Sequence, residues 1–374
     1  MAGPPRLGLV GVGALGARHA RTLAELAARP DAPLAFQGLF DLDGARAQAA
    51  VAAAGTTAYS DTESLFAACD GILVVVPTVA HRAVTERALD AGCHVLVEKP
   101  IADSLPAADQ MLARARAAGR GLWVGHSERF NPAVRAAAPM LAAPRYLEAR
   151  RLAGFTPRAT DVDVVLDLMI HDIDLALAIT GEEPSALEAI GVAVLTESED
   201  LANVRLEFPS GAVASLTASR VSPDKLRKLR VFAEHAYVTL DCLAGTAEAL
   251  RVDTEALARA AREYAAHAAH MAGVAPPPGA PAPDWTTLLD RRALAAPPGL
   301  PLTLEIEAFA RALVDEGALA APGRAADGAL RLATGADGRA ALAVAEAVKD
   351  AMRSRSARWS PAARRAAAPA TGRA

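Results

Sequence analysis

The sequence of 374 residues has little cysteine and no excess of basic charge. Its three cysteines, Cys69, Cys93 and Cys242, show neither CxxC nor metal-ligand spacing and lie among apolar residues. They indicate buried thiols in a reducing compartment rather than a disulfide framework. A net charge of -4 and a pI of about 6.1 provide no broad positive field. We therefore do not expect nucleic acid as a partner.

Long apolar runs and internal repeats are also missing. The stretch before the first apolar run, Met1–Arg6, is too short for a secretory core, and no run is long enough to span a membrane. These absences predict a cytoplasmic protein that does not bind membranes. The hydrophobic share of 52% is rich in alanine but ordinary for a globular chain, and the length favours two domains, each able to bury a core.

The first third of the chain alternates short apolar runs with alanine-rich stretches of helical period. This pattern is typical of a parallel sheet covered by helices, and it predicts a doubly wound domain over residues 1–128. The predicted strands are Leu7–Val10, Leu34–Phe40, Gly71–Val76, His94–Val97 and Gly121–Val124. The predicted helices are Leu15–Ala28, Asp43–Ala54, Val79–Ala91 and Leu105–Ala118.

The rhythm changes after Pro132, where alternating segments follow one another with short turns. Such a succession predicts a mainly antiparallel sheet in a second α/β domain, over residues 129–358. Its predicted strands are Arg145–Leu152, Leu187–Leu195, Asn203–Phe208, Ala212–Ser219, Leu226–Ala233 and Tyr237–Cys242. Its predicted helices are Asp167–Thr180, Thr254–His270, Leu304–Glu316 and Asp337–Met352. Val274–Pro283 reads as a loop, and residues 359–374 as a disordered tail.

A glycine-rich turn follows the first predicted strand, where residues 7–16 read LGLVGVGALG. In a GxGxxG turn the first glycine allows the tight bend, the second lets the backbone approach a pyrophosphate, and the third lets helix and strand pack closely. Free N–H groups at the helix start then bind the anion. Glycine turns also occur merely to close a strand–helix corner. The predicted cofactor contacts here are Gly11, Gly13, Ala14, Leu15 and Gly16.

An acidic residue follows the second predicted strand at Asp41. A carboxylate at this point of a dinucleotide-binding fold bonds the adenosine ribose hydroxyls and repels a 2'-phosphate, so NAD is favoured over NADP. The alternative is that Asp41 only caps the next helix, but Asp43 is better placed for that cap.

The segment Glu98-Lys99-Pro100 follows a buried predicted strand. Side chains at the carboxyl edge of such a sheet project into the ligand crevice, so Lys99 is placed to reach a substrate hydroxyl with Glu98 as its charge partner. Pro100 fixes the turn. The alternative interpretation is a surface ion pair.

A second candidate pair is Asp167 and His171, one turn apart on a predicted helix. The carboxylate can then orient the imidazole, which suits a general base near neutral pH. Asp172 and Asp174 lie on other faces of that helix. A purely structural contact is the alternative. Because these two residues supply only two plausible ligands, we do not expect a metal.

Residues 125–132 read GHSERFNP and follow the last strand of the first domain. Polar residues at a strand end followed by proline indicate a loop that faces the cleft. His126, Arg129 and Asn131 are the candidate ligand contacts, with Arg129 on substrate or cofactor oxygens. A solvated loop is the competing interpretation.

These segments, in this order, resemble the Gfo/Idh/MocA family of oxidoreductases over nearly the whole chain. The resemblance includes the run VVPTVAH at residues 75–81, the run EKP at residues 98–100, and Asp167 with His171 in the pattern DxxxH. It also includes Pro301–Glu305 and Thr334–Gly338 near the closing helices. The Val274–Pro283 stretch resembles an insertion, and the Ala/Arg tail has no counterpart in the family.

The resemblance implies a Rossmann domain, NAD as cofactor, and a second domain whose open sheet forms homodimers or homotetramers. It also implies that Lys99 and His171 act at the reacting hydroxyl, that Asp167 supports them, and that His171 takes the hydroxyl proton. The implied cofactor contacts include Pro77, Thr78, His81, Glu98, Lys99 and Arg129. The implied substrate contacts are His126, Arg129, Asn131, Asp167 and His171.

Residues 125–132 and 165–172 look like those of the branch that oxidises UDP-N-acetylglucosamine at its 3-hydroxyl. The keto product of that branch feeds an aminotransferase, which gives amino sugars for lipid A or other surface glycans. Two alternatives stay open. One is oxidation of a free sugar or a cyclitol such as inositol, and the other is a non-catalytic NAD-binding sensor or scaffold.

Overall fold

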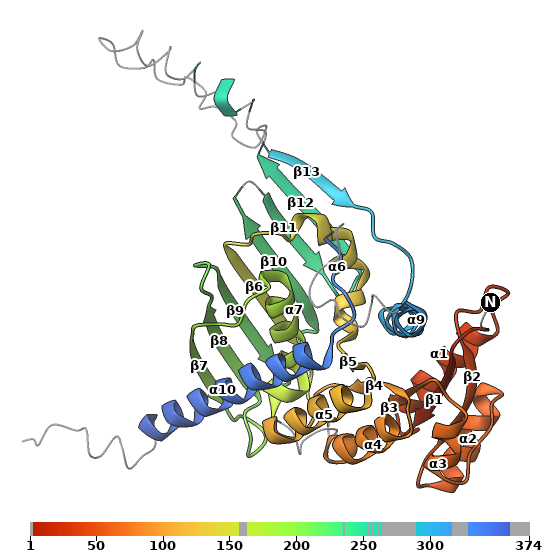
Figure 1. Ribbon diagram of the computed structural model, residues 1–374. Helices are drawn as coiled ribbons and strands as arrows, with labels where there is room; N and C mark the ends of the chain where they lie inside the picture. The colour runs from red at the N-terminus through yellow and green to blue at the C-terminus, as the bar shows by residue number, and fades with distance from the viewer. Residues whose placement is uncertain are drawn as a thin grey trace, which may run out of the picture.

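The computed structural model describes residues 3–156, 163–234, 236–252, 289–315 and 328–359, with a few positions between 255 and 262. Figure 1 shows two sheets that lie side by side, each with its own helices. The predicted loop Val274–Pro283 and the tail beyond residue 359 fall outside the described residues, as does most of the predicted helix Thr254–His270.

The N-terminal sheet is parallel and has the strand order β2-β1-β3-β4-β5. Its strands are β1 (Arg6–Val10), β2 (Ala35–Phe40), β3 (Gly71–Val74), β4 (His94–Glu98) and β5 (Leu122–Gly125). The helices of this part are α1 (Gly16–Ala27), α2 (Gly44–Ala54), α3 (Thr62–Ala67), α4 (Thr78–Asp90) and α5 (Leu105–Ala118). The predicted doubly wound sheet is confirmed, and α3 is the element that the prediction missed. Since all five strands are parallel, their carboxyl ends share one edge, where the glycine turn and Glu98 lie.

The second sheet has eight strands in the order β13-β12-β11-β10-β6-β9-β8-β7. All neighbouring pairs are antiparallel except β6 with β9. Its strands are β6 (Tyr146–Leu152), β7 (Ala186–Val192), β8 (Leu201–Glu207), β9 (Val213–Ser219), β10 (Leu226–Ala233), β11 (Ala236–Asp241), β12 (Thr246–Val252) and β13 (Leu289–Leu294). The predicted, mainly antiparallel open sheet is confirmed. The last two strands were not predicted from the sequence.

One face of this sheet is covered by helices, as Figure 1 shows for α6, α7 and α10. Inward residues such as Leu147, Val204 and Val231 are fully buried against these helices. The short helices after β5 are η1 (Ser127–Phe130), α6 (Pro132–Ala137) and η2 (Ala138–Met140), and the later ones are the π-helical turn η3 (Val165–Met169), α7 (Ile170–Thr180) and α10 (Gly335–Trp359). Within the described residues, no helix covers the opposite face.

The helix α9 (Pro301–Val314) packs against the N-terminal part rather than against the second sheet. Ile306 and Phe309 are buried in the same apolar cluster as Leu7 and Leu9 of β1. The amphipathic period of this segment predicts a helix but does not identify the sheet that it covers. A domain boundary at residue 128, as predicted from the sequence, therefore assigns α9 to the second domain although it packs into the core of the first. Among the described helices none is long and apolar enough to cross a bilayer.

Candidate active site

The glycine turn after β1 has the geometry of a phosphate cradle. Gly11 has a φ of 93°, and a Cβ there would lie 2.4 Å from the Val75 carbonyl oxygen. A Cβ at Gly16 would lie 2.0 Å from the carbonyl oxygen of Gly11, whereas a Cβ at Gly13 would meet nothing within 4 Å. The first and third glycines are thus required by the fold, and the second leaves its surroundings open for a ligand. This is the arrangement that a bound dinucleotide needs.

Asp41 lies at the carboxyl end of β2 and is held in place by the main chain. One of its carboxylate oxygens accepts the N–H of Val12 at 2.7 Å, and the other accepts the N–H of Asp43 at 2.9 Å. The helix cap belongs to Asp43, which accepts the N–H of Arg46 at 3.1 Å. Because each Asp41 oxygen has spare lone pairs, the carboxylate retains acceptors for ribose hydroxyls.

A cavity of about 890 Å³ runs from Asp41 to Lys99 along the carboxyl edge of the parallel sheet. Its volume suits an extended cofactor. Of the twelve predicted cofactor residues, only Arg129 does not line it. The eleven that do are Gly11, Gly13, Ala14, Leu15, Gly16, Asp41, Pro77, Thr78, His81, Glu98 and Lys99. His81 is itself buried, with its ring nitrogens 2.9 Å from the Pro100 carbonyl oxygen and 3.0 Å from that of Val76, so its contacts hold the wall together.

Lys99 follows β4 immediately, and its peptide bond to Pro100 is cis. Its Nζ donates to the main-chain carbonyl oxygen of Asp167 at 2.8 Å, which joins the N-terminal sheet edge to the second domain. Burial lowers the pKa of Lys99, while the carboxylates of Asp167 and Glu98 oppose that shift. Burial therefore weakens the ammonium form of this lysine relative to a lysine in solvent.

His171 is the second residue of α7, which directly follows the π-helical turn Val165–Met169. Burial lowers the pKa of His171 well below its usual value, and the positive charges of Lys99 and Arg151 add to that shift. The imidazole is therefore neutral at physiological pH. Its Nδ1 is buried and has no hydrogen-bond partner among the described residues.

Among the described residues, Nδ1 of His171 does not donate to the Asp167 carboxylate. Asp167 meets Lys99 instead: its main-chain carbonyl oxygen accepts from Lys99 Nζ, and its charge acts on that lysine.

Arg129 and Asn131 have packing contacts that differ from the predicted ligand contacts. The Arg129 guanidinium is 1% exposed and binds both oxygens of Asp174, at 2.8 and 2.6 Å. Its remaining nitrogen faces Asp337 at 3.5 Å and the carbonyl of Arg331 at 3.3 Å. Asn131 caps α6 and donates to the Cys242 carbonyl at 2.9 Å. These contacts hold both side chains in the packing, and neither residue lines the cavity that holds Lys99.

His126 lies nearer to the reacting groups. It is 1% exposed, and its Nδ1 is 3.9 Å from Asp174. In the part of the chain that the structure describes, neither ring nitrogen has a hydrogen-bond partner. Burial lowers the pKa of His126, and the charges of Arg129 and Lys99 also lower it. Two buried neutral histidines, His126 and His171, thus lie within electrostatic reach of Lys99.

A second buried pair was not predicted from the sequence. Arg151 binds both oxygens of Asp172, at 3.0 and 2.8 Å, and lies 3.5 Å from Glu128. Glu128 also accepts from Arg227 at 3.3 Å. The alternation along β6 could have predicted that Arg151 is buried, because it lies two residues after Ala149 and four after Leu147, which both point inward. The pair of Arg151 with Asp172 anchors the start of α7, next to His171.

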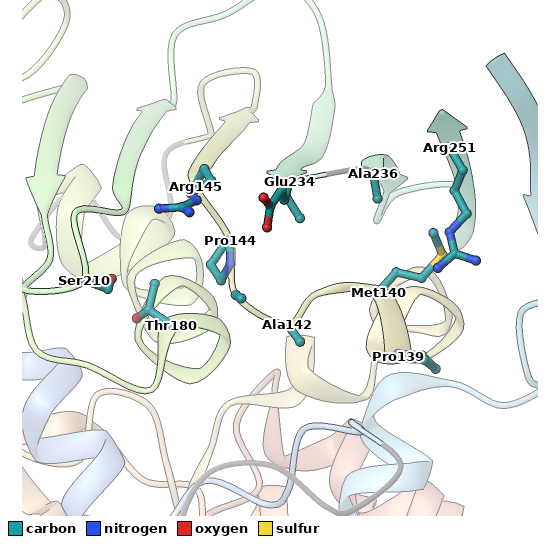
Figure 2. A pocket seen from close by; sticks show the side chains of 12 residues that line it. Pro139, Met140, Ala142, Pro144, Arg145, Thr180, Ser210, Glu234, Ala236 and Arg251 are labelled. Atoms are coloured by element: carbon teal, nitrogen blue, oxygen red, sulfur yellow. The ribbon is translucent and has the colours of Figure 1, made fainter. Parts of the chain in front are cut away.

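Another cavity, of about 520 Å³, lies at the β10–β11 hairpin and the end of α7. Figure 2 shows Arg145, Glu234 and Arg251 among its lining side chains. None of the predicted site residues lines this second cavity. The predicted cofactor residues thus gather at the cavity beside Lys99 and not at this one.

Comparisons with known proteins agree with this geometry. The model of the oxidoreductase family with an NAD-binding Rossmann fold, Gfo/Idh/MocA, matches residues 5–126, and the model of that family's C-terminal domain matches residues 143–239. The UDP-N-acetylglucosamine 3-dehydrogenase of Acidithiobacillus ferrooxidans is 39% identical over 242 residues, which cover 64% of this chain and 75% of the relative.

A solved structure of that dehydrogenase aligns over 94% of this chain and 98% of its own, with a TM-score of 0.76 and 32% identity. A myo-inositol dehydrogenase of Streptomyces leeuwenhoekii is 32% identical over 197 residues, which cover 50% of this chain and 59% of that one.

Proposed function

This chain belongs to the Gfo/Idh/MocA family of NAD-binding oxidoreductases, and from that membership we propose that it oxidises the 3-hydroxyl of UDP-N-acetylglucosamine to a ketone. The single observation that carries the proposal is the contact between Lys99 Nζ and the Asp167 carbonyl at the end of the cofactor cavity. It brings a lysine from the NAD-binding domain beside a neutral histidine of the second domain. A hydroxyl between those groups has both a proton acceptor and a hydrogen-bond donor.

NAD, when bound in the cavity, supplies the hydride acceptor. The protein contributes binding, orientation and proton handling. Lys99 hydrogen-bonds the reacting oxygen, and an imidazole nitrogen of His171 accepts the hydroxyl proton as the carbon loses hydride. Asp167 holds the lysine at its carbonyl. Burial lowers the pKa of both groups, so the imidazole of His171 is free to accept the proton and the ammonium form of Lys99 is weakened.

The sugar nucleotide as substrate is supported by the relative from Acidithiobacillus ferrooxidans, whose structure aligns along nearly the full length of both chains. We propose that the keto product is the substrate of an aminotransferase, leading to amino sugars for lipid A or another surface glycan. A cytoplasmic location is part of this proposal, and the three free, buried cysteines favour a reducing compartment.

The test is the absorbance of NADH during incubation with NAD and a panel of UDP-N-acetylglucosamine, N-acetylglucosamine, myo-inositol and glucose. We expect turnover with the sugar nucleotide, and loss of that turnover in Lys99→Met and His171→Gln. His94→Asn is the matched control, because His94 lies at the opposite end of β4 from Lys99. Turnover of myo-inositol alone would make the protein a cyclitol dehydrogenase, as the relative from Streptomyces leeuwenhoekii favours.

A non-catalytic sensor is the second class of function. It predicts NAD binding with no turnover on any panel member, and binding that is unchanged in Lys99→Met. The buried, unpaired His171 Nδ1 argues for the enzyme, since a sensor has no need of a base beside the cavity.

We also propose that the open face of the second sheet pairs with another copy of the chain, giving a homodimer or homotetramer. Large apolar side chains are exposed on this face, including Ile190 (41%), Val192 (44%) and Phe232 (37%). Phe232 stacks on Tyr237 with ring centroids 4.5 Å apart. Exposed apolar side chains of this kind mark association surfaces. Light scattering of Phe232→Lys against the parent tests this, and an unchanged oligomer would contradict it.

A further inference from the structure

His19 lies on α1, one turn after the glycine cradle, and has no role in the site described so far. Its side chain is 2% exposed. The Nε2 atom is 3.1 Å from Oε1 of Glu98, whose side chain is 13% exposed. The Nδ1 atom is 3.2 Å from the main-chain carbonyl oxygen of Leu15, within the cradle. One imidazole therefore connects the glycine turn with the end of β4, the strand that Lys99 follows.

The partners of His19 define where its protons lie. A carbonyl oxygen only accepts, so the contact with Leu15 requires a proton on Nδ1. A carboxylate also only accepts, so the contact with Glu98 requires another proton between Nε2 and Oε1. Donation through both nitrogens satisfies every partner at once. Hydrogen bonding from His19 and the charge of Lys99 lower the pKa of Glu98 against the effect of burial, which is consistent with a carboxylate there.

The second oxygen of Glu98 binds the main chain of Lys99, directly after β4. Oε2 accepts the main-chain N–H of Lys99 at 3.1 Å. Room for this carboxylate is provided on β5, because a Cβ at Gly125 would lie 3.2 Å from it. With one oxygen fixed by His19 and the other on the Lys99 N–H, the carboxylate sets the direction in which the lysine leaves the strand.

We propose that His19 is a positioning residue for the reaction, which donates through both ring nitrogens and so ties the glycine cradle to Glu98 and to the main chain of Lys99. The proposal rests on the proposed oxidoreductase function, because Lys99 is the group that His19 positions. It gives this histidine a role in turnover although it contacts neither substrate nor the reacting atoms.

Other charged and titratable groups also face Glu98. Burial raises the pKa of Glu305, on α9, and the charge of Glu98 adds to that rise. His126 after β5 and His81 on α4 both feel the Glu98 charge, which raises their pKa against burial. Removal of His19 thus leaves a buried carboxylate with Lys99 as its adjacent cation and with a second acid, Glu305, nearby. Such a carboxylate takes up a proton at higher pH than before.

The first test measures the protonation of His19 in the cofactor-free chain by NMR with nitrogen-15-labelled histidine. We expect N–H protons on both ring nitrogens of His19 in the parent, as its two acceptors require, and only one in Glu98→Gln, whose amide can donate to Nε2. A single N–H in the parent protein would overturn the proposal, whatever the activity.

The second test compares His19→Ala, Glu98→Gln, the double variant and His94→Ala in turnover. We expect His19→Ala to lower kcat by about 10- to 100-fold while KM for the sugar nucleotide and Kd for NAD change by less than about threefold. The acid limb of its kcat profile should move up by about 1–3 pH units as Glu98 protonates, and the double variant should lose that limb. His94→Ala should keep the parent profile.

The possible outcomes distinguish the proposed oxidoreductase function from the positioning role of His19. A parent protein with no turnover on any panel member refutes the proposed function. An active parent whose His19→Ala variant keeps its kcat and pH profile refutes the positioning role alone. Weakened NAD binding with unchanged kcat also refutes it, because His19 would then serve only the cradle. Thermal unfolding of each variant, with NADH fluorescence, reports whether the fold and cofactor site persist.

Discussion

Adding one methyl group at Gly13 should separate cofactor binding from folding. A Cβ built at this position meets nothing within 4 Å, and the residue does not have the left-handed φ that Gly11 has. An alanine that fits the backbone removes freedom from the unfolded chain and adds about 0.4–1 kcal/mol of stability. Gly13→Ala should therefore unfold at the same temperature as the parent or slightly higher.

The same methyl group should interfere with the cofactor, because it occupies the space that lets the backbone approach a pyrophosphate. Loss of one hydrogen bond to a charged group costs about 1.5–3 kcal/mol, which is about a 10- to 100-fold weaker Kd. Titration of NADH fluorescence measures that Kd, and thermal unfolding without cofactor measures stability.

The matched control is Gly16→Ala, three residues along the same turn. Its Cβ would lie 2.0 Å from the Gly11 carbonyl, so the helix or the turn must move. Overpacking of this kind costs about 1–3 kcal/mol, and we expect a lower unfolding temperature even without cofactor. If Gly13→Ala bound NADH as tightly as the parent, the pyrophosphate would not lie at this turn and the assignment would be wrong.

Three further outcomes follow from the site. Lys99→Met should lower kcat by about 100-fold or more, with Kd for NADH within about threefold of the parent; an equal loss of binding would contradict its role in chemistry. Because the pKa of His171 is lowered and oxidation needs its unprotonated form, kcat/KM should stay level as pH falls to about 6.5, and a decline starting above neutral pH would argue against this base. Arg129→Met should cost about 3–5 kcal/mol of stability by leaving Asp174 buried and unpaired, with partial recovery in the double variant with Asp174→Leu; no loss in urea unfolding would refute the pairing.

The cofactor half of the site was predictable from local sequence. Three predicted features follow parallel strands: the glycine turn after β1, the acid after β2 and the polar residues at the end of β4. Because the carboxyl ends of parallel strands meet at one edge of the sheet, the topology alone brings these features together. The helix cap was also assigned correctly to Asp43, because the cap preference depends only on position relative to the helix start.

The substrate half was less predictable, because it depends on long-range pairing. Arg129 in a polar loop suggests a ligand contact, but its partner Asp174 lies 45 residues away on α7. The contact between Lys99 and the main-chain carbonyl of Asp167 joins residues 68 apart in the chain, and residue types do not reveal it. The position of α9 was missed for the same reason, since an amphipathic face does not identify the surface that it covers.

The most direct test of the central claim uses UDP-N-acetylglucosamine that carries deuterium at carbon 3. After incubation with the protein and NAD, mass spectrometry of the reduced nicotinamide cofactor shows where its hydride came from. We expect deuterium in the reduced cofactor, which forms in step with the keto sugar nucleotide. With Lys99→Met, we expect no deuterated cofactor. Reduced cofactor without deuterium, or none at all while another sugar supports turnover, would contradict it.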